Sequence, residues 1–331
     1  KEPVGNLYSD GERLLAVGLA RTYSLQDLES RMTALKKRIA DGDSEAQLER
    51  MRLHLRGNNF DAALNDLRGA HQLRLEGEGP LAANKALYEG IRELDLITRD
   101  PRLSLRLIAD ANAHHLDAGA QSSVSKEELA EAATKRDGLL FATLNEIRTK
   151  EIASAADEVL KAAAMAEKPN LVNAARQALL ATVTEGDAEL VNNALTSENP
   201  NVRVVAVAGA APALGEKAIE KLSELLDDAS EDVRLFVSVA LLNEGDREAL
   251  SALGALLDAD DVRVRSRAVQ SLRAVSGQRF KYMAYEKDEA RKVAATAWRD
   301  WIAADGQTIE LKLPIGDSNV LLGRTLVAMY S

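Results

Sequence analysis

Cysteine is absent from the 331-residue chain, which excludes disulfides, thiolate nucleophiles and zinc sites built on sulfur. Aromatic residues make up only 4% of the chain, and no run of apolar residues is long enough to predict a membrane-spanning helix. Basic residues number 42 against 52 acidic ones, a formal net charge of −10. Because nucleic-acid binding depends on a basic surface, this balance predicts that nucleic acid is not a partner.

Sequence motifs for catalysis are also missing. The chain contains no glycine-rich phosphate loop, no Gly-x-Ser-x-Gly elbow and no His-Glu-x-x-His helix. Two adjacent histidines, His114 and His115, would point about 100° apart on a helix and could not share a metal. We therefore expect a protein that is not an enzyme and that holds no cofactor or metal.

Hydrophobic residues make up 46% of the chain and are mostly Ala, Leu and Val, a mixture that suits closely packed helices. Near the start, Ser24 predicts a helix N-cap, and an apolar stripe follows from Leu25 to Ile39. A second helix is predicted from Ser44 to the stop at Gly57. The sequence thus predicts helices from residue 24 onward.

A third helix is predicted from Asn59, with the small residues Ala63 and Ala70 seven apart. Residues 44–71 resemble the second half of a tetratricopeptide repeat, in which such residues let the neighbouring helix approach closely. We therefore expect residues 1–118 to form an irregular helical region that is partly tetratricopeptide-like. Residues 119–136 are predicted to be a linker and a first helix that leads into the next region.

A repeated phrase, Asn or Asp followed by Val-Arg, organises the second half of the chain. Copies begin at Asn201, Asp232 and Asp261, and their arginines lie 31 and then 29 residues apart: Arg203, Arg234 and Arg263. A fixed period near 30 is typical of a solenoid, in which each unit buries its apolar face against its neighbours. The predicted fold is therefore all-α, an α-solenoid of superhelical helix pairs.

Two helices per roughly 30 residues, with this phrase opening the first, resemble the short bacterial form of HEAT repeats, the PBS-lyase-like type. The resemblance covers residues 137–305. In each phrase the Asn or Asp is predicted to cap its helix. We expect Asn201, Asp232, Asp261, Arg203, Arg234 and Arg263 to form a structural ladder between units. The alternative is an arginine row that binds an anionic partner.

Five of the twelve aromatic residues lie near the end of the array: Phe280, Tyr282, Tyr285, Trp298 and Trp301. They resemble the terminal unit of planctomycete-type HEAT proteins, in which a Trp-x-x-Trp helix closes the stack. The alternative is an aromatic platform for a sugar or peptide ligand. Residues 306–331 are predicted to be a β appendage, because residues 307–313 and 321–330 suggest two strands. This appendage would be a short hairpin or the start of a β domain.

The resemblance implies a non-catalytic scaffold that binds protein partners along the concave face of the solenoid. Alternatives are a tetrapyrrole (bilin) lyase-like or other ligand-binding HEAT protein, a HEAT-like DNA glycosylase, and a spacer in a larger secreted enzyme or sensor. The chain begins at Lys1 rather than Met, for which a cleaved signal peptide is one explanation. An extracytoplasmic location is therefore slightly favoured over a cytoplasmic one.

Overall fold

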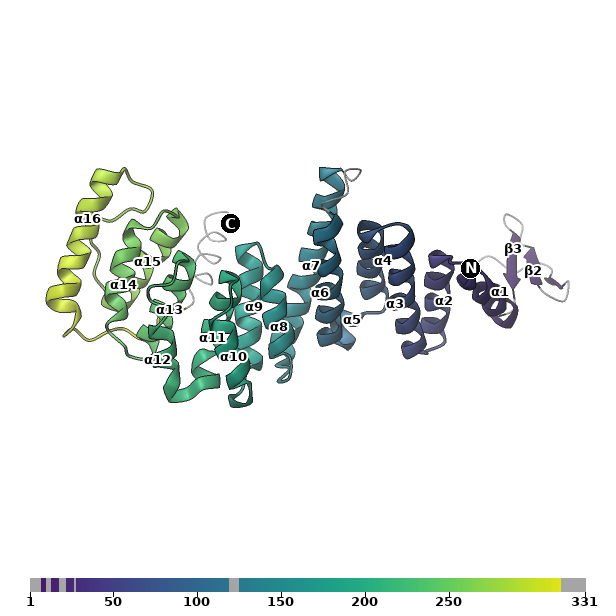
Figure 1. Cartoon of the computed structure of the whole chain (residues 1–331), viewed down its shortest axis with the longest axis horizontal. Helices are drawn as coiled ribbons and strands as arrows, with labels where there is room; N and C mark the ends of the chain where they lie inside the picture. The colour runs from purple at the N-terminus through teal and green to yellow at the C-terminus, as the bar shows by residue number, and fades with distance from the viewer. Residues whose placement is uncertain (1–6, 10–12, 18–21, 27, 119–124, 317–331) are drawn as a thin grey trace. The chain divides into compact units, whose positions relative to one another are not determined.

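The computed structural model describes residues 7–9, 13–17, 22–26, 28–118 and 125–316. The chain divides into two compact units, Lys1–Thr143 and Leu144–Ser331. The division falls inside the long helix α7 (Lys126–Lys150), which also contains the position at which the sequence predicted the array to begin. Figure 1 shows helices throughout both units.

The N-terminal unit begins with a small antiparallel sheet that the sequence did not predict. Its strands are β1 (Leu7–Ser9), β2 (Arg13–Val17) and β3 (Thr22–Gln26), in the order β1-β2-β3. Leu25 pairs with Leu14 across the sheet, so it does not open a helix. The predicted helix start at Ser24 is therefore wrong, because the backbone of residues 22–26 hydrogen-bonds to β2. The first helix starts only at Leu28.

The other described elements of this unit that precede α7 are helices. They are α1 (Leu28–Ala40), α2 (Ser44–Arg56), α3 (Phe60–Gly77), α4 (Pro80–Glu93), α5 (Leu96–Arg99) and α6 (Pro101–Ala118). The stop of α2 at Gly57 is confirmed, and its N-cap is Asp43, whose side chain accepts from the Ala46 N–H at 2.9 Å. Ala63 and Ala70 are fully buried, which allows α2 and α3 to pack closely.

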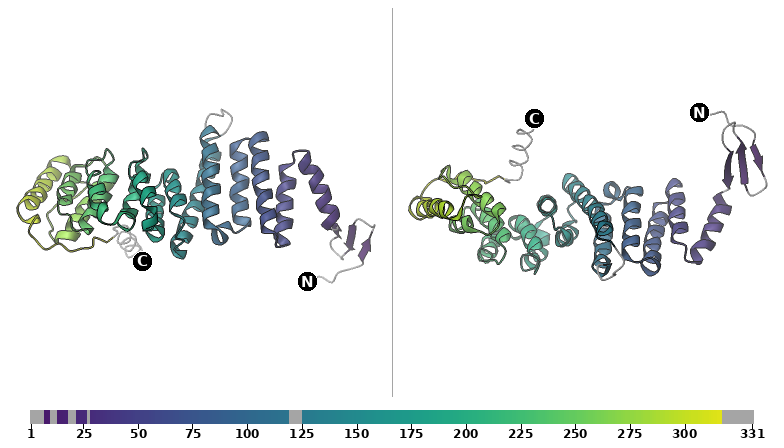
Figure 2. Two further views of the ribbon diagram at one scale, coloured as in Figure 1. Left: turned by 60° about the horizontal axis from the view of Figure 1, so that its bottom comes forward. Right: turned by 90° about the horizontal axis from the view of Figure 1, so that it is seen from above.

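The C-terminal unit is a series of helix pairs in which a longer first helix alternates with a shorter second one (Figure 2). The first helices are α9 (Pro169–Thr182), α11 (Pro200–Leu214), α13 (Glu231–Asn243) and α15 (Val262–Ser276). The others are α8 (Ala156–Met165), α10 (Ala188–Leu195), α12 (Ala218–Ser223), α14 (Ala249–Ala255) and α16 (Asp288–Trp301). Single turns η1 (Glu185–Asp187), η2 (Gly215–Lys217) and η3 (Leu256–Asp258) join some of them, and a π-helical turn η4 (Ile302–Gly306) follows α16.

Small residues let successive first helices approach one another. A Cβ added at Gly209 of α11 would lie 3.0 Å from the Leu179 side chain of α9, tighter than ordinary contact. Val205, Ala206 and Ala210 of α11 are fully buried beside it. The Ala- and Val-rich composition thus provides the core of this unit, and the all-α repeat class predicted from the sequence is confirmed for it.

The predicted C-terminal hairpin is not present in the described residues. Residues 307–316 form no strand, and the second predicted strand, 321–330, lies outside the described part of the chain. Instead, residues 307–316 run back along the array as an irregular segment, which we call the arm. Its alternation of exposure partly persists, with Ile309 and Leu311 half-buried and Glu310 exposed. The half-buried residues of the alternating segment thus pack against helix ends and not against a partner strand.

Candidate functional site

In the array an arginine recurs at a fixed distance from each helix cap. The side chains of Asn199, Ser230 and Asp261 cap α11, α13 and α15 at intervals of 31 residues. Four residues after each cap stands an arginine whose Nη1 donates to the carbonyl six residues back. These bonds are Arg203 to Ser197, Arg234 to Asp228 and Arg265 to Ala259, each 2.6 Å long.

The predicted ladder is therefore correct in part only. Asp261 is an N-cap, but Asn201 and Asp232 are not, since Asn199 and Ser230 take those places. Asn201 instead donates to the Ala166 carbonyl of the preceding unit at 2.8 Å. The expectation that the Asn or Asp of each phrase caps its helix is therefore wrong for α11 and α13. The phrase at 261–263 begins at the cap itself, whereas the other two copies begin two residues after their caps.

The arginines of the phrase also differ in their partners. Arg203 forms a bidentate pair with Asp228 at 2.7 and 2.8 Å, a true contact between units, with side chains 13% and 7% exposed. Arg263 instead pairs with its own Asp261 at 2.5 Å and is 58% exposed. The Arg263 side chain, by this hydrogen bond, lowers the pKa of Asp261 below its ordinary value. Arg265, absent from the predicted ladder, donates to the Ala284 carbonyl of the next unit at 2.9 Å.

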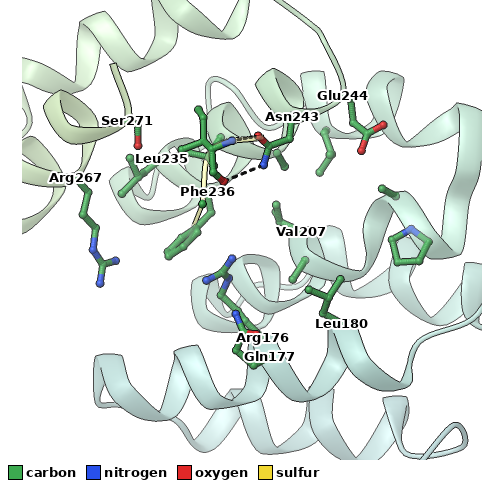
Figure 3. Close-up of a pocket in the computed structure, with 18 residues that line it drawn as sticks. Arg176, Gln177, Leu180, Val207, Leu235, Phe236, Asn243, Glu244, Arg267 and Ser271 are labelled. Atoms are coloured by element: carbon green, nitrogen blue, oxygen red, sulfur yellow. Dashed lines mark hydrogen bonds between the residues drawn. The ribbon is translucent and has the colours of Figure 1, made fainter. Parts of the chain in front are cut away.

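A hollow lies along the first helices of the C-terminal unit, and we call it the groove (Figure 3). Its volume is about 430 Å³, and its wall comes from α9, α11, α13, α15 and the arm. The lining residues include Arg176, Leu180, Val207, Leu235, Phe236, Asn243, Glu244, Arg267, Ser271 and Ile315. None of these residues belongs to the repeated phrase, so sequence reasoning did not single them out.

Two arginines stack on one aromatic ring in the groove. The guanidinium carbon of Arg176 lies 4.1 Å from the centroid of the Phe236 ring, and that of Arg267 lies 5.6 Å from it. Figure 3 shows Arg176 beside the ring. A guanidinium group over an aromatic ring makes a favourable cation–π contact, and Arg176 also donates through Nη1 to Asn173 Oδ1 at 3.2 Å. This part of the groove therefore combines the apolar ring of the half-buried Phe236 with two neighbouring guanidinium groups.

A smaller cavity of about 110 Å³ also borders Phe236 and Arg267, and it collects three residues of the predicted ladder: Asn201, Asp232 and Arg263. Asp232 and Glu167 place carboxylates beside these arginines. The charges here are mixed, so the cavity offers no row of arginines alone to an anionic partner. Phe236 and Arg267 are 31 residues apart and occupy equivalent places in successive units, whereas α11 has Val205 at that place. This departure from the repeat is the signal in the sequence that could have located the groove.

The arm closes one end of the groove. Asn243, at the end of α13, accepts from the Ile315 N–H through Oδ1 at 2.6 Å and donates through Nδ2 to the Ile315 carbonyl at 3.4 Å (Figure 3). Lys312 N–H donates to the Val275 carbonyl at 2.8 Å, and Arg247 donates to the Ile309 carbonyl at 2.7 Å. Apart from the buried Ile315 side chain, the array therefore contacts the arm mainly through hydrogen bonds to the arm's backbone.

The aromatic residues at the end of the array form a compact cluster. Trp298 is completely buried and makes edge-to-face contacts with Phe280, at 4.8 Å between centroids, and with Trp301, at 5.9 Å. Tyr282 is buried and donates its hydroxyl to the Leu257 carbonyl. Tyr285 alone is largely exposed. Four of the five residues therefore pack into the end of the stack, as expected for a terminal cap, and do not form an open platform.

The described residues contain no group of three or more His, Asp or Glu side chains that could hold a metal ion. In the same part of the chain, no helix is both long and apolar enough to cross a bilayer. The groove itself combines apolar, amide and guanidinium groups, which can bind a polypeptide by burial and hydrogen bonding.

Comparison with protein families agrees with this architecture. Residues 187–273 match the family model described as HEAT repeats. The searches of curated proteins and of solved structures gave no match. The matched residues contain the helices from α10 to α14 and most of α15, and three of these helices, α11, α13 and α15, carry the recurring caps and arginines. Residues 187–273 of the chain are therefore HEAT repeats.

Proposed function

We propose that this protein is a non-catalytic scaffold that binds a polypeptide segment of another protein in the groove along its first helices. HEAT repeats are generally protein-interaction elements. The observation that carries the proposal is that the groove already accommodates polypeptide, because the backbone of Ile315 is bound by Asn243. A surface that binds one irregular segment of backbone is chemically suited to bind another.

The composition of the groove supports a peptide ligand. Leu180 is 52% exposed at its edge, and Phe236 is half-buried in its wall. Exposed apolar groups surrounded by polar ones are typical of interaction sites. The tetrapyrrole alternative depended on the aromatic cluster, and burial of Trp298, Trp301 and Tyr282 leaves that cluster little surface for a flat ligand.

The test is peptide selection on the full chain followed by affinity measurement. Short peptides are selected from a random display library, and their dissociation constants are measured by fluorescence anisotropy. Leu180→Asp places a charge on the groove and should weaken binding about tenfold or more, because an anchor contact contributes over about 1 kcal/mol. Val293→Asp is the matched control, since Val293 is 74% exposed on α16, outside the groove. Equal loss in both variants, or in neither, contradicts the proposal.

A further inference from the structure

The arm binds the array in a manner that specifies a class of partner. The carboxamide of Asn243 contacts both the N–H and the carbonyl of the same residue, Ile315. One acceptor and one donor on a planar group match the two hydrogen-bonding groups of one backbone residue, as the edge of a strand does. This contact recognises the backbone of a bound segment whatever its side chains, provided the residue is not proline.

The side chain at the same position supplies selectivity. Ile315 is buried in the wall of the groove, whereas Leu313, two residues earlier, is 38% exposed. Asn243 stays exposed to solvent even with Ile315 bound. A segment approaching from solution therefore meets an accessible amide beside a site that fits a branched aliphatic side chain.

The other hydrogen bonds of the arm are few and directed to backbone. Arg247 donates to the carbonyls of Gly306 and Ile309, and Lys312 donates its N–H to the Val275 carbonyl. A segment held by one buried side chain and scattered backbone contacts can be exchanged for another that makes equivalent contacts. The arm differs in this from the terminal helix α16, which buries Trp298 and Trp301.

We propose that the partner is an extended segment with a branched aliphatic residue whose backbone pairs with Asn243, and that residues 307–316 occupy this place intramolecularly until such a segment displaces them. The inference rests on the proposed function and adds the chemistry of the ligand and a competitor within the chain. Because the arm is covalently attached, its effective concentration is on the order of millimolar, and it lowers the apparent affinity for any partner.

The test uses a fluorescent peptide with the sequence of residues 307–316, added to the full chain. Ile315→Ser removes the aliphatic anchor of the attached arm. This variant should bind the peptide about tenfold or more tightly than the wild type, because the attached competitor is weakened. Leu313→Ser is the matched control in the same arm and should leave the affinity unchanged. A peptide in which the isoleucine equivalent to Ile315 is serine should not bind either protein.

Asn243 is tested in the background of Ile315→Ser. Adding Asn243→Leu should remove the gain in affinity, and Asn243→Asp, which keeps the size but cannot donate, should reduce it. Thermal denaturation verifies that each variant is folded. The inference is overturned if Ile315→Ser binds the peptide no more tightly than the wild type, or if the Asn243 variants bind it equally well. In that case, library-selected peptides whose affinity is still lowered by Leu180→Asp would leave the proposed function standing. Only the inference about the arm and the chemistry of the partner would be wrong.

Discussion

The two units of this protein stabilise stacked helices in different ways. In the N-terminal unit each polar contact is individual. Arg50 forms a bidentate contact with the buried Asp66, and Asn84 donates to the Ala111 carbonyl at 2.8 Å. In the C-terminal unit the same contact recurs, an arginine that donates to the carbonyls of the turn before its own helix, as Arg234 does.

This difference concerns how readily a contact can be repeated from one helix pair to the next. A side chain that bonds to backbone carbonyls needs no particular partner residue, so the same arginine can serve in every unit. A contact such as that of Arg50 with Asp66 requires both residues to be present. It does not recur in another helix pair unless both residues recur there. The backbone-directed contact recurs within residues 187–273, which match HEAT repeats.

The largest expected effect is at the end of the array. Trp298→Ala should reduce the free energy of unfolding by about 3–5 kcal/mol, because it leaves a large cavity between Phe280 and Trp301. Urea denaturation measures the loss, and hydrogen exchange should locate it in the C-terminal unit. Tyr285→Ala, at an exposed ring, is the control. A loss below about 1 kcal/mol for Trp298→Ala would contradict the assignment of a terminal cap.

The ion pair of Arg203 with Asp228 is tested by comparison with the arginine of another copy of the phrase, Arg263. Arg203→Ala should cost about 2–4 kcal/mol, since it leaves the buried Asp228 carboxylate unpaired. Arg263→Ala should cost less than about 0.5 kcal/mol, because its ion pair with Asp261 is solvent-exposed. Thermal and urea denaturation of the two variants measure the difference. Equal costs would contradict the larger contribution assigned to the buried ion pair.

Individual contacts of the N-terminal unit should also matter locally. Asn84→Ala should cost about 1–3 kcal/mol, because the buried Ala111 carbonyl loses its donor. Glu89→Ala, on the exposed face of the same helix α4, should cost less than about 0.5 kcal/mol. Urea denaturation with hydrogen exchange in α4 and α6 distinguishes the two variants. Similar stability of both would mean that Asn84 does not hold these helices together.

The smallest expected effect is a pH dependence in the N-terminal unit. Burial raises the pKa of Tyr88 to about 12, above its ordinary value. The neutral phenol is thus favoured in the folded state, and its contribution to stability is complete below pH ~10 and is lost as the pH rises towards 12. Tyr88→Phe should flatten the decline of stability over this interval in urea titrations. An unchanged alkaline profile in the variant would contradict the assigned burial effect.

The sequence predicted the repeat and its period because these depend on local patterns. Helix stops such as Gly57 and small residues such as Ala70 could be recognised in the same way. The register of the third repeat was missed because Asp261-Val262-Arg263 imitates the phrase while Arg265 makes the equivalent contact. Several residue types can cap a helix, so the cap could not be identified from one phrase.

The groove and the arm could not be predicted because they depend on contacts between distant residues. Arg176 and Phe236 belong to different helices, and Asn243 meets Ile315 across 72 positions in the sequence. The alternating pattern of residues 307–313 predicted a strand, but this segment is irregular, with Ile309 and Leu311 half-buried and Leu313 exposed. The N-terminal sheet was missed because a helical stripe from Leu25 to Ile39 begins inside β3. Local periodicity is ambiguous where strand and helix meet.

Cross-linking from a single introduced thiol tests the central claim most directly, and the absence of cysteine makes such a thiol unique. Leu180→Cys in the groove and Val293→Cys on α16 are each labelled with a benzophenone and irradiated with a library-selected peptide. Both positions are exposed, so both accept the label. We predict that the peptide cross-links at position 180 and not at position 293. Efficient cross-linking at position 293 with none at 180 would contradict binding in the groove.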